Sequence, residues 1–455
     1  MILTHAASRK PQEARTIRIS VMAPPKFLFL LVVVVLASVF VASNAEQPPP
    51  GRTLHLPVFF RHPPDAMSLA SVADDDRPPL RSPLQSGVAH DSGGYFAALG
   101  VGTPPSRALL ILDTGSDFTW LQCAPCRRCH PQLTPLYDPR RSSSYAPVPF
   151  ASPRCRDELQ FPGRDARTGA CLYALAYADG SSSRGEVAAD ALAFSSGVVR
   201  NVTIGCGRDN EGLLGAAAGV LGVGRGVLSF PTQLAAATNN AYARVFSYCL
   251  GDRDARAETS SSYLVFGRAT EPPSAAFTPM RTSARKPSQY VVDMVGFSVD
   301  GAPVVVVAGA DDLALDPATG RGGVVVDSGA TVSRFSLHTY AALRDAFDAR
   351  AAAAAGMRNV RENISVYDAC YELLPTARVP AVAMHFAGGA DVVLRRRNYL
   401  VPVESRGRTY YCFGFMGFAP NSADERNTLG NVQQQGFHIV FDEERKRIGF
   451  APNGC

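Results

Sequence analysis

The sequence predicts an all-β protein built from two lobes. Short aliphatic runs such as ALLILD (108–113) and FHIVFD (437–442) are bounded by Gly, Pro and Asp, which is the pattern of strands joined by turns. The 39 Gly and 34 Pro residues are spread along the chain and favour many short strands over long helices. A chain of 455 residues is long enough for two domains with sizeable cores.

The N-terminal residues predict entry into the secretory pathway. Lys26 precedes the apolar run FLFLLVVVVLASVFVA (27–42), and the small residues SNA (43–45) follow it. This order is typical of a signal peptide, predicted over residues 1–45, with Met22 as an alternative start. The run is shorter than the about 20 residues that usually span a membrane, which favours a cleaved signal peptide. Because cleavage would remove the run, no stable membrane insertion is expected afterwards. An uncleaved anchor is the competing interpretation.

Residues 46–88 are rich in Pro, His, Arg and Asp and show little hydrophobic periodicity. Their position directly behind a signal peptide predicts a removable propeptide, and a disordered linker is the alternative. The strand pattern begins near Tyr95. We therefore expect an N-terminal lobe over residues 89–281 and a C-terminal lobe over residues 282–455.

Composition narrows the environment and the partners. The formal net charge of +5 comes from scattered Arg residues with no basic block, so no nucleic-acid partner is expected. In an oxidising compartment the ten cysteines predict disulfides. The sequons NVT and NIS make Asn201 and Asn363 candidate glycosylation sites. We expect the protein in the secretory pathway, outside the cell in the apoplast, or in the vacuole.

The clearest helix follows Ser336. The segment LHTYAALRDAFDARAAAAA (337–355) places Tyr340, Leu343 and Phe347 on one face, which predicts a helix packed on a core. We expect the alanine run to extend this helix.

One motif occurs twice. GVVVDSGAT (323–331) repeats the layout of LLILDTGSD (109–117), with an aliphatic run, an Asp, a hydroxyl residue and a Gly. Asp113 and Asp327 lie 214 residues apart, and each half also has a later apolar–Gly element, at 219–226 and 428–442. These pairs predict an internal duplication with one copy in each lobe.

Two aspartates that meet between such lobes have a defined chemistry. Two neighbouring carboxyls cannot both ionise readily, so they share one proton and titrate as a unit. One carboxylate then takes a proton from water while the other, protonated, donates to a carbonyl oxygen. The arrangement predicts hydrolysis of a peptide bond with neither a metal nor a covalent intermediate.

The motifs resemble those of a known family. DTGS (113–116) and DSGA (327–330), with flanks such as YFAALGVGTPP, WLQCAPCRRC, YADGSSSRGEVAAD and LGNVQQQGFHIVFD, resemble the pepsin-like aspartic proteases, in their plant nepenthesin-like branch. That family is the standard example of a shared-proton dyad. The resemblance runs from Tyr95 to Cys455. It implies two β lobes related by a pseudo-two-fold axis with a cleft between them, no cofactor, no metal, and a secreted monomer made as a zymogen.

The resemblance assigns roles residue by residue. Asp113 and Asp327 match the catalytic dyad, and Ser116 matches the residue that hydrogen-bonds the outer oxygen of Asp113. The remaining supporting residues of the two loops are Thr114, Gly115, Ser328, Gly329 and Thr331. Tyr177, Asp179 and Gly180 match the flap, the hairpin that closes over substrate, and Trp120 matches the residue whose indole donates toward the flap tyrosine. For Trp120, an ordinary core aromatic is the alternative.

One position departs from the family pattern. Ala330 stands where the second loop usually has a hydroxyl residue like Ser116. Asp327 would then lack one donor to its charged form, which raises its pKa and predicts a less acidic pH optimum. Thr331, the next residue, is the candidate to compensate in part.

The cysteines need two separate arguments. CAPCRRCH (123–130) contains the C-x-x-C-H pattern of haem attachment and could begin a zinc site, but no second ligand pair follows at finger spacing. The resemblance instead implies the disulfides Cys123–Cys126, Cys129–Cys206, Cys249–Cys455 and Cys370–Cys412. Phe150 and Ala166 stand where the family would place two further cysteines. Each loss leaves one remaining cysteine, Cys155 or Cys171, without its usual partner, which predicts that these two form a disulfide with each other.

The sequence therefore predicts an aspartic endopeptidase that cleaves flexible proteins or peptides. The alternative is a catalytically silent relative that acts as a binding or inhibitor protein, because some plant relatives keep the fold and have lost catalytic residues.

Overall fold

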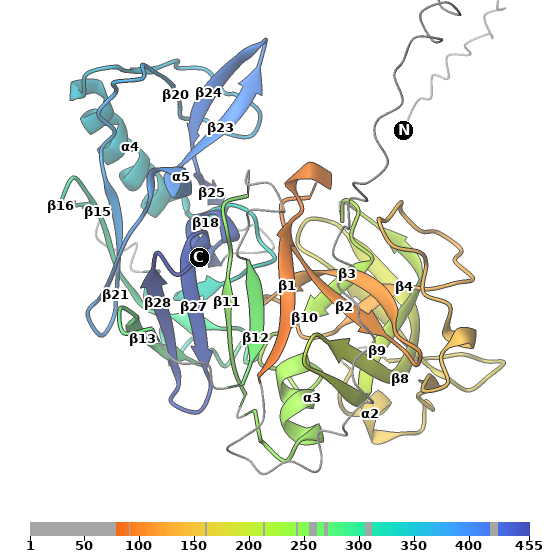
Figure 1. Cartoon of the computed structure of the whole chain (residues 1–455). Helices are drawn as coiled ribbons and strands as arrows, with labels where there is room; N and C mark the ends of the chain where they lie inside the picture. Colours follow the sequence, from red (N-terminus) through yellow and green to blue (C-terminus); the bar gives the residue numbers. More distant parts are fainter. Residues whose placement is uncertain are drawn as a thin grey trace, which may run out of the picture. The chain divides into compact units, whose positions relative to one another are not determined.

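The computed structural model describes residues 79–90, 92–159, 162–212, 214–242, 244–253, 262–267, 272–304, 312–418 and 426–455. These residues form mainly strands, as the sequence predicts (Figure 1). The predicted signal peptide and most of the predicted propeptide lie outside the described residues. In the described part of the chain, no helix has the length and apolar character needed to cross a membrane.

The strands of the N-terminal lobe surround a buried central strand, β3. Aliphatic residues fill β3 and its neighbours, so both faces of the strand are covered. The longest pair, β8 and β9, forms a hairpin that continues from the flap. The strands are β2 (Tyr95–Val101), β3 (Ser106–Asp113), β4 (Trp120–Gln122), β5 (Ala146–Pro147), β6 (Gly163–Arg164), β7 (Cys171–Ala176), β8 (Ser182–Phe194), β9 (Gly197–Glu211) and β10 (Gly219–Gly222).

The C-terminal lobe has an equivalent central sheet and two further sheets of four strands. The central strands are β14 (Val291–Val292), β17 (Val324–Val326), β18 (Ser333–Ser336), β25 (Phe415–Phe418) and β26 (Asn427–Leu429). One outer sheet contains β16 (Ala302–Pro303), β15 (Met294–Val299), β21 (Val382–Phe386) and β22 (Ala390–Val393). The other contains β19 (Met357–Asn359), β20 (Cys370–Leu373), β24 (Arg408–Phe413) and β23 (Leu400–Ser405).

Strand pairing confirms the two related lobes. In the N-terminal lobe, β3 pairs in parallel with β10, β4 pairs in parallel with β9, and β10 is antiparallel to β4. In the C-terminal lobe, β17 pairs in parallel with β26, β18 pairs in parallel with β25, and β18 is antiparallel to β26. The two later apolar–Gly elements of the sequence are thus the parallel partners of the two aspartate-bearing strands.

Both halves of the chain also contribute to one antiparallel sheet. Its order is β1 (Leu80–Ser86), β12 (Tyr263–Phe266), β11 (Val245–Cys249), β27 (Phe437–Asp442), β28 (Arg447–Pro452) and β13 (Ala276–Arg281). In Figure 1, orange β1, green β11 and β12, and blue β27 and β28 lie side by side. β1 comes from the end of the predicted propeptide, and its Leu80 and Leu84 are buried in the main core.

The predicted helix after Ser336 is confirmed as α4 (Leu337–Ala353). The Ser336 side chain caps it by accepting the Thr339 N–H, and Tyr340, Leu343 and Phe347 are buried along one face. The first three residues of the alanine run, 351–353, extend the helix, which ends at Ala353. The other helices are short: α2 (Pro153–Arg156), α3 (Phe230–Ala237), α5 (Arg396–Tyr399), α6 (Asn431–Gln434), η2 (Val88–His90) and η3 (Pro139–Arg141).

All ten cysteines form disulfides, and three predicted pairs are confirmed: Cys155–Cys171, Cys249–Cys455 and Cys370–Cys412. The other two predicted pairs, Cys123–Cys126 and Cys129–Cys206, are wrong. The structure instead joins Cys123 to Cys206 and Cys126 to Cys129.

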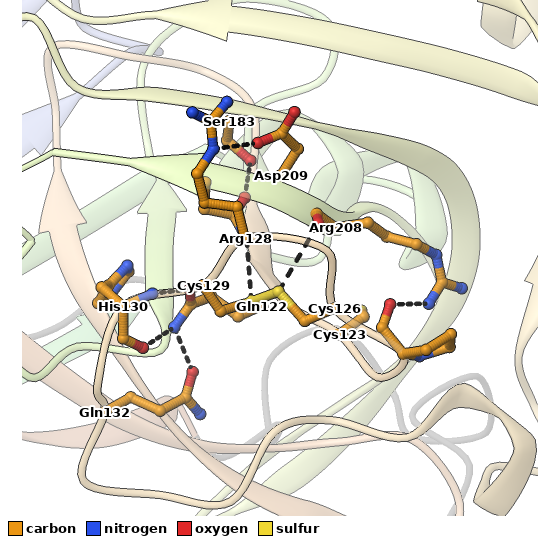
Figure 2. Close-up of a disulfide and its surroundings, with 12 residues drawn as sticks. Gln122, Cys123, Cys126, Arg128, Cys129, His130, Gln132, Ser183, Arg208 and Asp209 are labelled. Atoms are coloured by element: carbon orange, nitrogen blue, oxygen red, sulfur yellow. Dashed lines mark hydrogen bonds and ion pairs between the residues drawn. A yellow bond between two sulfur atoms is a disulfide. The ribbon is translucent and has the colours of Figure 1, made fainter.

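Strand packing explains this correction. β4 runs in parallel beside β9, so the cysteine that directly follows β4 lies next to Cys206, with 5.3 Å between Cα atoms. The remaining cysteines, Cys126 and Cys129, close their own short loop (Figure 2). That loop is bound to β9, because the Arg127 N–H donates to the Arg208 carbonyl at 2.8 Å and Arg128 pairs with the Asp209 carboxylate at 2.6 Å.

Candidate active site

The two aspartates lie at equivalent ends of the two central strands. β3 ends at Asp113, and Asp327 directly follows β17. The neighbouring parallel strand holds each backbone: Val223 N–H donates to the Asp113 carbonyl at 2.9 Å, and Asp327 N–H donates to the Leu429 carbonyl at 3.0 Å. Buried aliphatic side chains precede both aspartates, so each strand runs through the core and ends with its carboxyl where the two lobes meet.

The residues after the aspartates lock the two loops together. The Thr114 hydroxyl donates to the Val326 carbonyl at 2.8 Å, and the Ser328 hydroxyl donates to the Leu112 carbonyl at 2.9 Å. Each hydroxyl oxygen also accepts the N–H of the other residue, at 2.9 and 3.1 Å. Both side chains are fully buried. The four bonds form two equivalent pairs, as expected for loops related by an approximate two-fold axis. We call them the Thr114–Ser328 lock, and they hold the two aspartate loops against each other.

Gly115 and Gly329 are needed for close approach. A Cβ at residue 115 would collide with the Asp327 carboxyl, and a Cβ at residue 329 would collide with the Asp113 carboxyl. Neither glycine has a positive φ, so the turn itself does not require them. Their missing side chains let each carboxyl reach the opposite loop.

The two carboxyls are in contact. They hydrogen-bond each other, and burial raises the pKa of both. Burial and the negative charge of Asp113 together raise the pKa of Asp327 to about 7. Because donors around Asp113 favour its charged form, Asp327 is the carboxyl that is protonated more readily, and two such groups titrate as a unit.

The donors around the two carboxyls differ. Asp113 accepts the Gly115 N–H at 2.8 Å and the hydroxyl of Ser116. Asp327 accepts the N–H groups of Gly329 and Ala330 at 2.9 and 3.2 Å, with no side-chain hydroxyl in the position of Ser116. The expected compensation by Thr331 is not found, because among the described contacts its side chain lies against Gly93 and not against Asp327.

A chain of hydrogen bonds joins the flap to Asp113. Tyr177 is the first residue after β7, and the flap turn closes where its N–H donates to the Ser181 carbonyl at 2.8 Å. Asp179 accepts the Ser181 N–H within the turn, and Gly180 adopts φ +87°. The indole N–H of the fully buried Trp120 donates to the Tyr177 hydroxyl at 2.7 Å, and Tyr177 hydrogen-bonds Ser116. Trp120 is therefore more than a core aromatic.

Comparison with known proteins places this arrangement in a family. The chain is 44% identical to "Aspartyl protease family protein 2" of Arabidopsis thaliana over 378 residues, which cover 82% of this chain and 73% of that protein. It is 31% identical to "Aspartic proteinase nepenthesin-2" of Nepenthes gracilis, over 82% of this chain and 81% of that protein. The chain belongs to the pepsin-like aspartic proteases of plants.

Two family models match the chain, and solved structures share its fold. The models named Xylanase inhibitor N-terminal and Xylanase inhibitor C-terminal match residues 95–268 and 289–452 of this aspartic protease. The fold is similar to the crystal structure of edgp, with a TM-score of 0.65 and 20% identity over 82% of this chain and 94% of that one. It is also similar to Basic 7S globulin from soybean, with a TM-score of 0.63 and 20% identity over 82% and 96% of the two chains.

Sequence reasoning missed two amide side chains beneath the dyad of this protease. Gln434 donates to the Asp327 carbonyl at 3.2 Å and accepts from the hydroxyl of Tyr248. Asn431 donates to the Ser328 carbonyl at 3.1 Å. Both amides are buried, and buried amides need partners. The run NVQQQ between two buried strands, where apolar residues would be usual, is the signal that could have found them.

Ser298, His385 and Asp391 form a hydrogen-bonded set that resembles a catalytic triad. Ser298 lies 2.8 Å from Nε2 of His385, and Nδ1 of His385 lies 2.7 Å from the Asp391 carboxylate. The order resembles a nucleophile, a base and an orienting acid. However, β15 is hydrogen-bonded to β16 and β21 on its two sides, so the N–H groups around Ser298 are committed to the sheet and cannot stabilise an oxyanion. We interpret the set as a cross-strand polar ladder.

Proposed function

We propose that this protease is an endopeptidase in which Asp113 acts as general base and Asp327 as general acid. The observation that carries the proposal is the asymmetric, proton-sharing pair held by the reciprocal Thr114–Ser328 lock. Two carboxyls fixed in contact, with one ionised and one protonated, are what the hydrolysis needs at its start.

The proposed reaction uses only these two groups and water. Asp113 takes a proton from a water molecule as the water oxygen bonds to the peptide carbon, and Asp327 gives its proton to the carbonyl oxygen. The resulting diol intermediate collapses when Asp113 passes its new proton to the amide nitrogen, the C–N bond breaks, and Asp327 recovers a proton from a diol hydroxyl. The dyad then has its starting protonation state.

The flap is proposed to hold the substrate over the dyad. Tyr177 is tied by its hydroxyl to Trp120 and Ser116, so its ring has a fixed position above the first catalytic loop. Asp179 and Gly180 shape the hairpin end, and the backbone of this hairpin is the candidate for hydrogen bonds to an extended peptide. The expected substrates are flexible proteins or peptides.

Processing and location extend the proposal. We infer that residues 1–45 direct the chain into the secretory pathway and that the propeptide is removed by a cut within residues 46–88. The mature chain would begin before Leu80, because β1 is buried and pairs with both β12 and β2. Asn201 and Asn363 are both exposed, so an oligosaccharide would reach them without unfolding. The mature protein is proposed to be a monomer outside the cell or in the vacuole.

A second candidate function is binding without catalysis. The two matching family models are named for xylanase inhibitors, which supports this candidate. The presence of both aspartates, Ser116 and Tyr177 in a connected network supports the protease instead.

Cleavage of a denatured protein across pH 2–8 tests the proposal. The acid-treated full chain is compared with its Asp113→Asn and Asp327→Asn variants. We expect cleavage that disappears in both variants and is blocked by a peptide transition-state mimic. A folded wild-type protein that cleaves nothing at any pH would favour the binding candidate.

A further inference from the structure

The loop that follows β10 (residues 223–226) touches the first catalytic loop at three points. The N–H groups of Val223 and Gly224 donate to the carbonyls of Asp113 and Ser116, both at 2.9 Å. The Gly226 N–H donates to the Asp117 carboxylate at 2.8 Å. The position of this loop therefore sets the position of Asp113 and Ser116.

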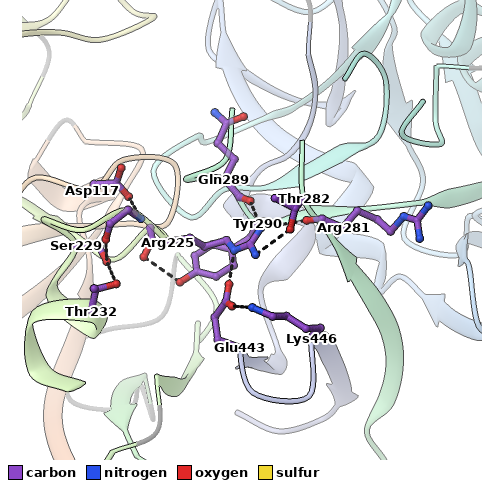
Figure 3. A network of polar contacts seen from close by, with 12 residues as sticks. Asp117, Arg225, Ser229, Thr232, Arg281, Thr282, Gln289, Tyr290, Glu443 and Lys446 are labelled. Atoms are coloured by element: carbon purple, nitrogen blue, oxygen red, sulfur yellow. Dashed lines mark hydrogen bonds and ion pairs between the residues drawn. The ribbon is translucent and has the colours of Figure 1, made fainter. Parts of the chain in front are cut away.

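The third residue of the loop, Arg225, extends its side chain into a buried polar site (Figure 3). Its Nε donates to the Glu443 carboxylate, which lies in the turn between β27 and β28 and also pairs with Lys446. The Arg225 and Glu443 side chains are only 7% and 5% exposed. A buried pair of this kind contributes little net stability, because desolvation of the two charges offsets their attraction. A role in geometry explains its presence better than a role in stability.

The guanidinium also binds residues 281–289, which lead from the end of β13 toward β14 and are called the crossing segment here. Nη1 donates to the carbonyls of Arg281 and Gln289 at 3.1 and 3.2 Å, and Nη2 donates to the Thr282 hydroxyl at 3.1 Å. These acceptors lie in different directions around one planar group. A lysine ammonium carries the same charge, but it lacks a planar fork of donors that could reach all of them.

The crossing segment also binds the catalytic side of the same loop. The Arg225 N–H donates to the Ser288 carbonyl at 2.8 Å, and the Ser288 side chain hydrogen-bonds Asp117. The buried Tyr290, just beyond the segment, donates to the Val223 and Gly224 carbonyls at 3.0 and 3.1 Å. The loop is thus held between the catalytic residues on one side and the crossing segment on the other.

We propose that Arg225 is a positioning residue for catalysis: its buried guanidinium holds the 223–226 loop on the crossing segment, and this loop holds Asp113 and Ser116 in place. The inference deepens the proposed function and rests on it. Arg225 acts only through the backbone of its neighbours and touches none of the reacting groups.

Arg225→Lys in the mature full-length protein is the main test, with Arg344→Lys as the matched control. Arg344 is an ion-paired arginine on α4 that pairs with Asp345 and Asp368. For Arg225→Lys we expect kcat to fall by at least about tenfold with KM within about threefold, because a misplacement of about 1 Å can cost about 100-fold.

The pH profile separates positioning from general destabilisation. The Gly115 N–H and the Ser116 hydroxyl lower the pKa of Asp113, so displacing the loop should move the acid limb of kcat/KM up by about one pH unit. Asp327, Asp117 and Tyr177 also face Asp113 and are unchanged in every variant. A lower melting temperature with wild-type kcat and an unmoved acid limb would overturn the proposal.

A readout that needs no activity keeps the two proposals distinguishable. Trp120 is the single Trp of the chain and lies three residues after Asp117, at the start of β4. We expect red-shifted, more quenchable emission for Arg225→Lys and unchanged emission for Arg344→Lys. If the folded wild type cleaves nothing, the proposed function fails and the emission still tests the loop contact.

A second variant is available should Arg225→Lys fail to fold. Thr282→Val removes one acceptor of the Arg225 guanidinium, and we expect its kcat to be about threefold lower and to be restored in Thr282→Ser. An unchanged kcat in Thr282→Val would overturn the proposal.

Discussion

Replacing Ala330 with Thr should move the alkaline limb of the pH–rate profile toward acid. The two catalytic loops give their carboxylates equivalent backbone donors, but only Asp113 also has a hydroxyl donor, from Ser116. A hydroxyl at residue 330 would supply the missing bond to Asp327. Because such a bond stabilises the charged carboxylate, the pKa of Asp327 should fall.

The magnitude follows from the strength of one hydrogen bond to a charged group. That bond contributes about 1.5–3 kcal/mol, and one pKa unit corresponds to about 1.36 kcal/mol. The pKa of Asp327, raised to about 7 by burial and by the charge of Asp113, should therefore fall by about one to two units. In the proposed mechanism the enzyme is active while one proton remains on the dyad, so loss of that proton would set the alkaline limb.

The assay is kcat/KM for a peptide substrate between pH 3 and pH 9. Ala330→Val is the matched control, because valine has the shape of threonine and lacks the hydroxyl. The alkaline limb should move toward acid by about one to two pH units in Ala330→Thr and stay in place in Ala330→Val. Coincident alkaline limbs for the two variants would refute the reasoning, since steric change alone would then account for any effect.

Three further predictions concern the flap, the dyad and the Cys155–Cys171 disulfide. Trp120→Phe removes the indole donor to Tyr177 and should lower kcat/KM by about fivefold, from a lost bond of about 1 kcal/mol, with melting temperature as the control for packing. The pKa of Asp327 is raised in the folded state, so its protonated form favours folding below about pH 4 and this contribution is lost as pH rises toward 7. Asp327→Asn should therefore melt higher than wild type at pH 7 and by less, or not at all, at pH 4; a difference that does not change with pH would contradict the assignment. Replacing both Cys155 and Cys171 with Ser opens a bridge of sequence separation 16 and should cost about 3 kcal/mol, measured by denaturant unfolding followed through Trp120, which packs in the same cluster. An unchanged unfolding midpoint would argue against the bridge, as would free thiols at both positions in peptide mapping.

The local pattern of the sequence was sufficient for the fold class and for the dyad. Aliphatic runs that end in Asp-Thr-Gly and Asp-Ser-Gly can be recognised without tertiary information, because the apolar strand and the polar residues that end it are neighbours in the sequence. The helix after Ser336 was predictable for the same reason, since its cap and its apolar face lie within one segment. The resemblance to a family added the flap, and the Trp120–Tyr177 bond agrees with it.

Contacts between distant segments could not be predicted in this way. Spacing alone does not distinguish Cys123–Cys126 from Cys123–Cys206; the parallel packing of β4 on β9 decides it. The reason for Gly115 is the opposite carboxyl, 212 positions further along the chain, and not its own turn.

The sequence by itself thus determined which residues are proposed to carry the chemistry: two aspartates, each at the end of a buried strand, in a chain with an even number of cysteines. Tertiary structure alone decided how they are held. The Thr114–Ser328 lock, the amide of Gln434 under Asp327 and the Arg225 contact with Glu443 each join residues more than 100 positions apart. Side chains with such roles are polar and buried, and their partners become known only when the chain has folded, because hydrogen bonding depends on position in space and not on order in the sequence.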